Sequence, residues 1–212
     1  MLLTNIKSSL IQNRVNLFFL DGSYLPFFVD DVVKLSLNKN QELDEEKLKQ
    51  IKSLSLFYLG NNYSLRQIAI SPKTEKILSQ KLKKYFINIT QKYKLLLTFP
   101  YETVIDQIIT GLKEKKLLNE SDYINHFIQK NKSKSVREIQ FLLKHQGVNI
   151  SSIDLSLNND KDSIKKILFK KHINMELLAD FNFKNKLYAS LYRKGFQISD
   201  IKTAIDEYLA IK

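Results

Sequence analysis

Gly147-Val-Asn-Ile-Ser-Ser-Ile153 recurs 48 residues later as Gly195-Phe-Gln-Ile-Ser-Asp-Ile201. The flanking apolar residues recur at the same offset, with Ile139, Leu143 and Leu157 matched by Leu187, Leu191 and Ile205. Because the chain has only five glycines, the agreement of two of them in register indicates a repeated unit. A short repeat of this kind is typical of proteins that present an interaction surface rather than a single catalytic pocket.

The first half of the unit has the pattern of a helix that ends at a glycine. Ile139, Leu142 and Leu143 are spaced by three and four residues, so they share one helix face. Gly147 follows one turn later, and glycine most readily adopts the left-handed backbone that ends a helix. We therefore expect Gly147 and Gly195 to be structural turn residues. The residue after each glycine, Val148 or Phe196, can fold back onto the last helical turn.

A second helix follows the turn. Ile150, Ile153 and Leu157 restart the same periodicity, which makes the unit a tight helix-turn-helix. Ser151, like Ser199 in the other copy, falls near the start of this helix, where a hydroxyl can cap a free backbone N–H. Asn149 is an equally good cap, and the residues do not decide between them.

A degraded third copy lies upstream. Its first helix aligns at an offset of 61, with Leu78, Leu82 and Ile87 in the places of Ile139, Leu143 and Val148. Its second aligns at an offset of 49, with Tyr101, Val104 and Ile108 in the places of Ile150, Ile153 and Leu157. The two offsets imply about twelve inserted residues within 86–99. Because Phe86 replaces the glycine, we expect a different turn there.

The repeats suggest four consecutive parts. We expect an N-terminal module at 1–55, a first repeat at 56–131 with the insertion at about 86–99, a second at 132–178 and a third at 179–212. Asn119 and Asp122 form a cap pair, which places the third helix of the first repeat at 120–131. Its counterpart in the second repeat falls near 160–172. The predicted fold class is mainly α, with tandem three-helix repeats in an elongated arrangement and a small N-terminal β-hairpin.

The N-terminal module has a different pattern. Asp21-Gly22 stands between two aromatic and branched runs, a strong signal for a β-hairpin. Pro26 places the second run at the edge of a sheet, because proline cannot donate a ladder hydrogen bond. The acidic segment Asp44-Glu-Glu46 opens a helix that continues through Leu56.

Composition narrows the class of protein. The chain has 212 residues and no cysteine, so disulfides and thiolate metal sites are excluded. No apolar run approaches the roughly 20 residues that cross a membrane, and the N-terminus lacks the pattern of a signal peptide. We therefore expect a cytoplasmic protein without membrane contact.

The positive charge is concentrated in the repeats. Residues 1–55 hold seven basic and seven acidic residues, whereas 56–212 hold 27 basic and 15 acidic residues and hence the whole net charge of +12. A basic surface of this kind suits a polyanion, most commonly nucleic acid. A lysine-rich surface that only maintains solubility is the alternative.

Motifs of catalysis are missing from the sequence. We find no P-loop, no GxGxxG and no GxSxG. His126, His145 and His172 have no metal-ligand spacing with one another or with nearby carboxylates. The sequence therefore predicts no enzyme, no metal site and no cofactor.

Three segments resemble the RecX family of bacterial recombination regulators. They are Leu118-Asn-Glu-Ser-Asp-Tyr123, Ser135-Val-Arg-Glu-Ile-Gln-Phe-Leu-Leu-Lys-His-Gln-Gly147 and Leu187-Tyr-Ala-Ser-Leu-Tyr-Arg-Lys-Gly-Phe196. The resemblance covers roughly 70–212. Asn119 stands where the family usually has an acid, and Ser135 where it usually has a glycine.

The resemblance implies a fold and a function. Family members are curved tandem three-helix repeats that lodge in the groove of the RecA filament on single-stranded DNA. They damp its ATPase, strand-exchange and coprotease activities, within DNA repair and the SOS response. Accordingly, we expect a monomeric, non-catalytic partner of the RecA filament and of its single-stranded DNA, with free DNA as a further ligand.

Seven cations are the candidate polyanion-facing residues: Lys130, Lys132, Lys134, Arg137, Lys144, Arg193 and Lys194. Two other functions stay open. A direct DNA-binding helix-turn-helix protein would read base edges with its second helix. A protein-only adaptor would ignore nucleic acid.

Overall fold

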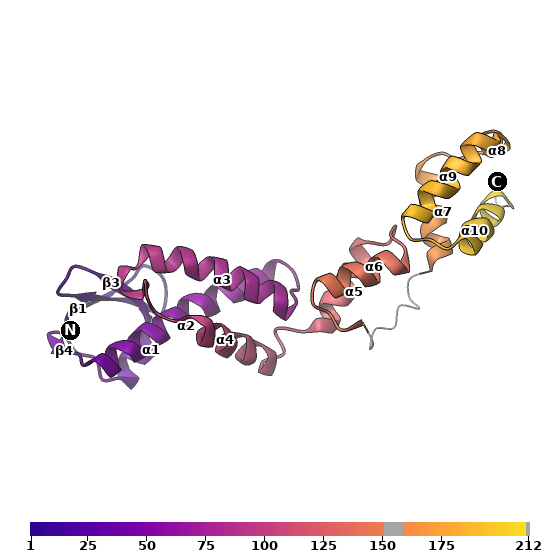
Figure 1. Cartoon of the computed structure of the whole chain (residues 1–212). Helices are drawn as coiled ribbons and strands as arrows, with labels where there is room; N and C mark the ends of the chain where they lie inside the picture. The colour runs from indigo at the N-terminus through magenta and orange to yellow at the C-terminus, as the bar shows by residue number, and fades with distance from the viewer. Residues whose placement is uncertain (151–158, 211–212) are drawn as a thin grey trace. The chain divides into compact units, whose positions relative to one another are not determined.

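The computed structural model describes residues 1–150 and 159–210, and these are mainly helical (Figure 1). The predicted fold class is confirmed in its mainly α character. The chain divides into two compact units, Met1–Asn119 and Glu120–Lys212. The predicted N-terminal hairpin is part of a larger element, an antiparallel sheet of four strands.

The sheet has the strand order β3-β2-β1-β4. Its strands are β1 (Leu2–Ser8), β2 (Arg14–Phe19), β3 (Tyr24–Phe28) and β4 (Gln41–Glu42). The predicted hairpin is confirmed, because β2 pairs with β3 across Asp21-Gly22 and Gly22 has a φ of 77°. Pro26 lies on β3, at the edge of the sheet as predicted. β1 and β4 were not predicted from the sequence.

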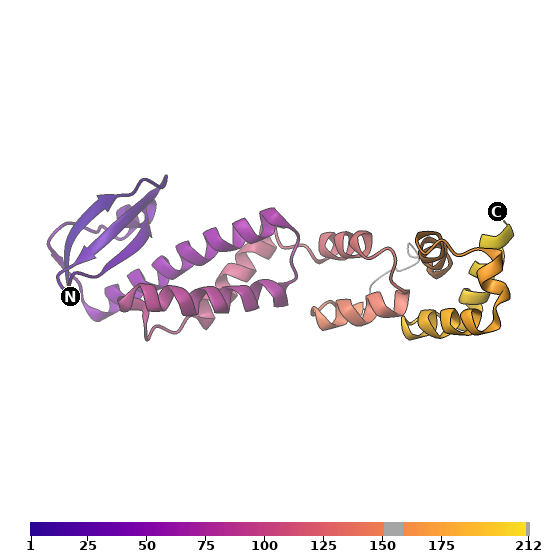
Figure 2. The same cartoon turned by 90° about the horizontal axis from the view of Figure 1, so that it is seen from above.

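A short and a long helix follow the sheet. α1 (Val29–Lys34) continues directly from β3, and α2 (Glu45–Ile70) begins where the Asp44 carboxylate accepts the Lys47 amide at 2.7 Å. α2 runs without interruption through residues 55 and 56, where the sequence suggested a module boundary. The reason is packing, because Ser55 Oγ donates to the Pro26 carbonyl at 2.8 Å and α2 packs against β3. Figure 2 shows the sheet and the helices of the first unit from above.

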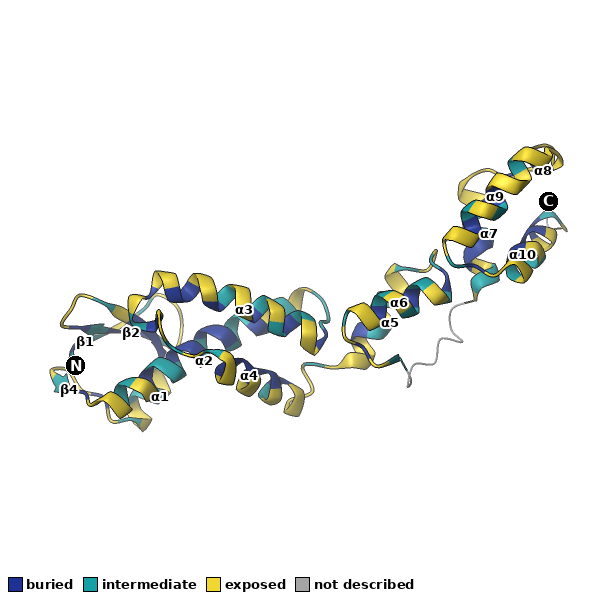
Figure 3. Ribbon diagram, in the orientation of Figure 1, coloured by how far each residue is buried: buried dark blue, intermediate teal, exposed yellow. Residues whose placement is uncertain are grey.

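Two further helices complete the first unit. α3 (Glu75–Lys92) is followed by the 3₁₀ turn η1 (Lys94–Leu96) and by α4 (Glu102–Glu114). The turn expected at Phe86 is wrong, since Phe86 lies inside α3 and is fully buried. The buried side chains of α2, α3 and α4 form one core with those of the sheet (Figure 3).

Gly60 sets the approach of α2 to α3 and α4. A Cβ placed on Gly60 would lie 2.5 Å from Phe86 Cζ and 2.6 Å from Ile108 Cδ1. Both distances are shorter than any van der Waals contact between carbon atoms. Only a glycine at this position allows the two side chains to pack against the backbone of α2.

The second unit is wholly helical in the part that the structure describes. Its helices are α5 (Glu120–Lys130), α6 (Val136–His145), α7 (Asp160–Lys170), α8 (Met175–Ala179), α9 (Phe181–Arg193) and α10 (Ile198–Ala210). α5 and α7 match the two predicted third helices, whereas α8 was not predicted. The second helix expected at Ser151–Leu157, with Ser151 as a cap, lies outside the described residues. In the other copy α10 begins at Ile198, so Ser199 lies within its first turn.

The glycine turns are confirmed. Gly147 and Gly195 follow α6 and α9 with φ of 86° and 87°. The chain then folds back, as the Val148 amide donates to the Leu143 carbonyl at 3.1 Å and the Phe196 amide to the Leu191 carbonyl at 3.4 Å. Val148 and Phe196 are both buried, as a hydrophobic contact onto the last turn requires.

Two other helices end in the same turn without a glycine. Lys116 after α4 and His172 after α7 have φ of 54° and 52°. The Leu117 amide donates to the Leu112 carbonyl at 2.9 Å, and the Ile173 amide donates to the Leu168 carbonyl at 3.1 Å. A side chain with a Cβ is strained in this backbone conformation.

Gly60→Ala should destabilise the protein, although alanine is the better helix former. The clash with Phe86 and Ile108 should cost about 1–3 kcal/mol, more than the roughly 1 kcal/mol gained in helix propensity. Gly111→Ala in α4 is the matched control, because nothing lies within 4 Å of a Cβ there. Urea unfolding followed by circular dichroism should show a lower midpoint for the first variant and an unchanged or higher one for the second. Equal midpoints would contradict the close packing at Gly60.

Substitutions at two helix-ending turns, Gly147→Ala and His172→Gly, should change the stability of the protein in opposite directions. Gly147→Ala forces a Cβ into left-handed backbone and should cost about 1 kcal/mol, whereas His172→Gly removes such a Cβ and should gain about as much. Thermal unfolding of the two variants beside the wild type measures both changes. A destabilised His172→Gly variant would mean that the imidazole makes a stabilising contact that outweighs the backbone strain.

Candidate functional site

One serine joins the start of α6 to the end of α9. The Ser135 hydroxyl accepts the Glu138 amide at 3.1 Å, which caps α6, and donates to the Lys194 carbonyl at 2.7 Å. The serine is fully buried. A Cβ on Gly195 would lie 2.7 Å from its Oγ, so this contact also depends on glycine at position 195. Residues near 135 and near 194 are thereby held together.

A second pair of contacts ties α7 to the same region. Asp160 Oδ1 accepts the Val136 amide at 2.7 Å, and Ser163 Oγ donates to the Lys132 carbonyl at 2.8 Å. Burial raises the pKa of the Asp160 carboxyl above its usual range, while the hydrogen bond from Val136 lowers it. The segment that precedes α6 is therefore fixed by side chains at the start of α7.

These contacts place an open groove of about 680 Å³ between α6 and the end of α9. Four of the seven predicted cations line it: Lys134, Arg137, Arg193 and Lys194. Lys134 directly precedes the Ser135 cap of α6, and Arg137 lies in the first turn of that helix. Arg193 is the last residue of α9, and Lys194 follows it. The structure thus brings together residues that lie more than 50 positions apart in the sequence. We call this surface the basic groove.

The charge of the basic groove is strongly positive. Among the described residues, its lining includes a single carboxylate, that of Glu138, which forms an ion pair with Lys134. Arg137, Arg193 and Lys194 are exposed. Arg193 Nε donates to the Ala189 carbonyl at 3.3 Å, a bond that leaves the other guanidinium nitrogens available. A neighbouring hollow of about 400 Å³ shares Arg137, Tyr192 and Gly195 with the groove.

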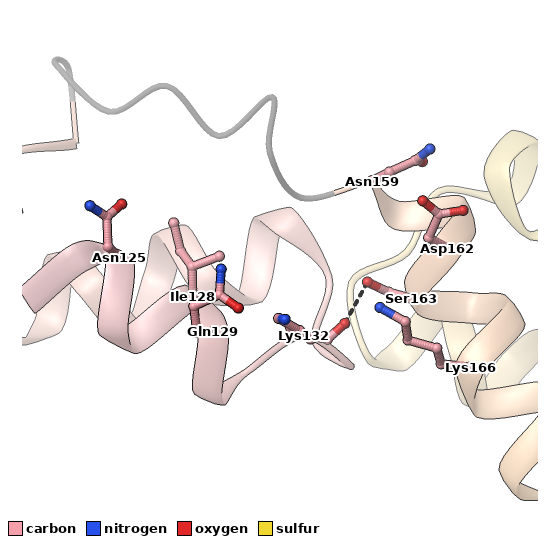
Figure 4. Close-up of a pocket in the computed structure, with 8 residues that line it drawn as sticks. All are labelled: Asn125, Ile128, Gln129, Lys132, Asn159, Asp162, Ser163 and Lys166. Atoms are coloured by element: carbon pink, nitrogen blue, oxygen red, sulfur yellow. Dashed lines mark hydrogen bonds between the residues drawn. The ribbon is translucent and has the colours of Figure 1, made fainter.

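The three remaining predicted cations lie elsewhere. Lys132 lines a separate small pocket of about 230 Å³, together with Asp162, Ser163 and Lys166 (Figure 4). Lys130 is exposed in the last turn of α5. Lys144 is exposed two turns along α6 from Arg137, on the same side of the helix but outside the groove lining.

Sequence reasoning missed two aromatic residues of the basic groove. Phe141 and Tyr192 line it and are 68% and 59% exposed. The signal was present, because Phe141 follows Arg137 by four residues and so shares its helix face rather than the apolar face of Ile139 and Leu143. Tyr192 directly precedes Arg193 at the end of α9.

Within residues 1–150 and 159–210, no group of three or more His, Cys, Asp or Glu side chains could hold a metal ion. Of the predicted lone histidines, His126 has a buried Nε2 and His172 occupies the turn after α7. In the same part of the chain, no helix is both long and apolar enough to cross a membrane.

Sequence comparison identifies relatives along most of the chain, although no family model matches it. Regulatory protein RecX of Streptococcus pneumoniae strain Hungary19A-6 is 28% identical over 205 residues, which cover 92% of this chain and 74% of the relative. The protein of the same name from S. pneumoniae serotype 19F strain G54 is 27% identical over the same coverage.

Two solved structures share the fold. A crystal structure of regulatory protein RecX aligns with a TM-score of 0.65 at 20% identity, over 97% of this chain and all of that one. The crystal structure of RecX from Lactobacillus salivarius aligns with a TM-score of 0.54 at 22% identity, over 72% of this chain and 96% of that one. The chain is therefore similar over 92% of its sequence to regulatory proteins named RecX, and it shares the fold of the solved RecX structures.

Proposed function

We propose that this chain is a non-catalytic regulator of the RecA recombinase. It binds the RecA filament on single-stranded DNA as a monomer in the cytoplasm and lowers the ATPase, strand-exchange and coprotease activities of RecA. The observation that carries the proposal is the basic groove, which four cations at the start of α6 and the end of α9 line together. The regulatory names of the relatives support the same function.

The groove is suited to binding rather than to chemistry. Its cations can contact phosphates, and each such contact gains free energy by releasing condensed counterions from the nucleic acid. Because the groove is open, a polymer can run through it. We assign the groove no catalytic role.

The charge of α10 argues against a helix-turn-helix that reads duplex DNA. As the second helix of its repeat, α10 would be the recognition helix, yet it carries one lysine against three acids: Lys202, Asp200, Asp206 and Glu207. Glu207 is further engaged with Lys165 of α7 at 2.5 Å. An acidic helix is repelled by the phosphates that flank the major groove.

Titrating the protein into cognate RecA on single-stranded DNA should lower the steady-state rate of ATP hydrolysis. Inhibition is expected well below the protein concentration that saturates bare DNA, because the filament rather than free DNA is the target. No inhibition together with binding to free DNA would favour a direct DNA-binding protein. Neither inhibition nor DNA binding would favour a protein adaptor.

Arg193→Glu should raise the concentration needed for half-maximal inhibition by about tenfold, the equivalent of about 1.4 kcal/mol. The salt dependence of binding should flatten by about 0.7 in slope, because one phosphate of a single strand is no longer neutralised. Lys39→Glu is the matched control, an equal change of charge at an exposed position before β4 of the first unit. If both variants inhibit like the wild type, the basic groove is not the contact surface.

A further inference from the structure

Two exposed aromatic rings lie among the cations of the basic groove. Phe141 on α6 and Tyr192 on α9 both line it. Phe141 shares a helix face with Arg137, and Tyr192 directly precedes Arg193 in the sequence. Exposing most of two large rings to water is unfavourable, because they lose the free energy that burial in a hydrophobic core would provide. The neighbouring apolar positions of the same helices, Leu143 and Leu191, are buried.

The combination of rings and cations fits a specific ligand chemistry. Proteins that hold single-stranded nucleic acid place cations along the backbone and stack bases on aromatic side chains, which accept any base because every base has a π-face. The basic groove provides both, with cations from the start of α6 and the end of α9 and one ring from each helix. Its volume of about 680 Å³ lies within the range of roughly 300–1,000 Å³ typical of pockets that hold small organic groups.

Charge complementarity selects the occupant. The described lining has four cations and one carboxylate that is already paired, so an anionic polymer is favoured over an apolar peptide segment. A duplex is excluded as the stacking ligand, because its bases are stacked on one another and not available to a side chain. An unpaired strand offers both phosphates and free base faces.

We propose that Tyr192 and Phe141 are base-stacking residues, and that the basic groove holds an unpaired nucleotide of single-stranded DNA with its phosphates against Arg137, Arg193 and Lys194. This proposal rests on the proposed function for its biological setting. It adds that the affinity for single-stranded DNA depends on contacts with the bases as well as with the phosphates. Lys134 and Glu138, which form an ion pair, also line the groove.

Fluorescence anisotropy with two labelled strands of equal length tests the proposal. One strand is oligo(dT), and the other carries abasic sites in place of all thymines. The full-length protein should bind oligo(dT) about tenfold more tightly, because stacking adds to the phosphate contacts. Tyr192→Ala and Phe141→Ala should each reduce this preference and together abolish it, with affinity for the abasic strand unchanged. Tyr192→Phe should keep the preference, because the ring remains.

Phe181→Ala is the matched control. Phe181 is 74% exposed on α9, the helix that carries Tyr192, but it does not line the groove. This variant should keep the full preference for bases, whereas Arg137→Glu should weaken binding to both strands alike. Equal affinity of the wild type for the two strands would overturn the proposal, and an acidic protein segment would then be the better occupant of the groove. A preference that survives both aromatic substitutions would also overturn it, because the bases would then be bound by other residues.

The strand-binding assay contains no RecA, so its result is independent of the regulatory function. A base preference that is reduced in Tyr192→Ala and in Phe141→Ala and disappears when both are combined would establish stacking even if the protein failed to inhibit RecA. If the protein inhibits RecA but binds the two strands equally, the proposed function is supported and the stacking role of Tyr192 and Phe141 is contradicted.

Discussion

The hydroxyl of Ser135 makes the contact on which the basic groove depends. One buried oxygen caps the first turn of α6 and donates to the carbonyl of Lys194 after α9. Because Gly195 has no Cβ, the end of α9 can approach this oxygen, and its left-handed backbone turns the chain back toward Leu191. The segment Lys194-Gly195 therefore ends α9 and allows the start of α6 to lie close to it. This places Arg137 and Arg193 beside the same groove.

In the first unit, too, a glycine allows neighbouring elements to pack closely. Gly60 lets Phe86 and Ile108 pack directly against the backbone of α2, so that α3 and α4 share one core with the sheet. In both units a missing Cβ determines how closely two elements approach. The glycines of this lysine-rich chain are few, and those at 60, 147 and 195 serve packing or turns, each with a physical reason.

Features that depend on neighbours in the sequence could be predicted. The Asp21-Gly22 hairpin, the acidic start of α2 and the turns at Gly147 and Gly195 each follow from local backbone chemistry. Strands β1 and β4 could not be predicted, because their pairing is with distant segments. Phe86 was misplaced for a similar reason, since the space it fills is created by a glycine on another helix.

The candidate site, too, could be predicted from the sequence only in part. The sequence named seven candidate cations, but only a contact between distant residues gathers four of them into one groove. Phe141 and Tyr192 were overlooked because an aromatic residue in a helix normally belongs to a core. Their exposure becomes evident only once Ile139, Leu143, Leu187 and Leu191 are seen to occupy the core positions.

The double role of Ser135 also bears on how this part of the molecule unfolds. In proteins built from successive helical units, each unit is stabilised by its neighbours as well as by its own contacts. Fraying of α9 withdraws the Lys194 carbonyl from the Ser135 hydroxyl, and melting of the first turn of α6 withdraws the hydroxyl from the carbonyl. The two helices are thus coupled at their ends, and the basic groove is a composite surface that exists only while both are folded.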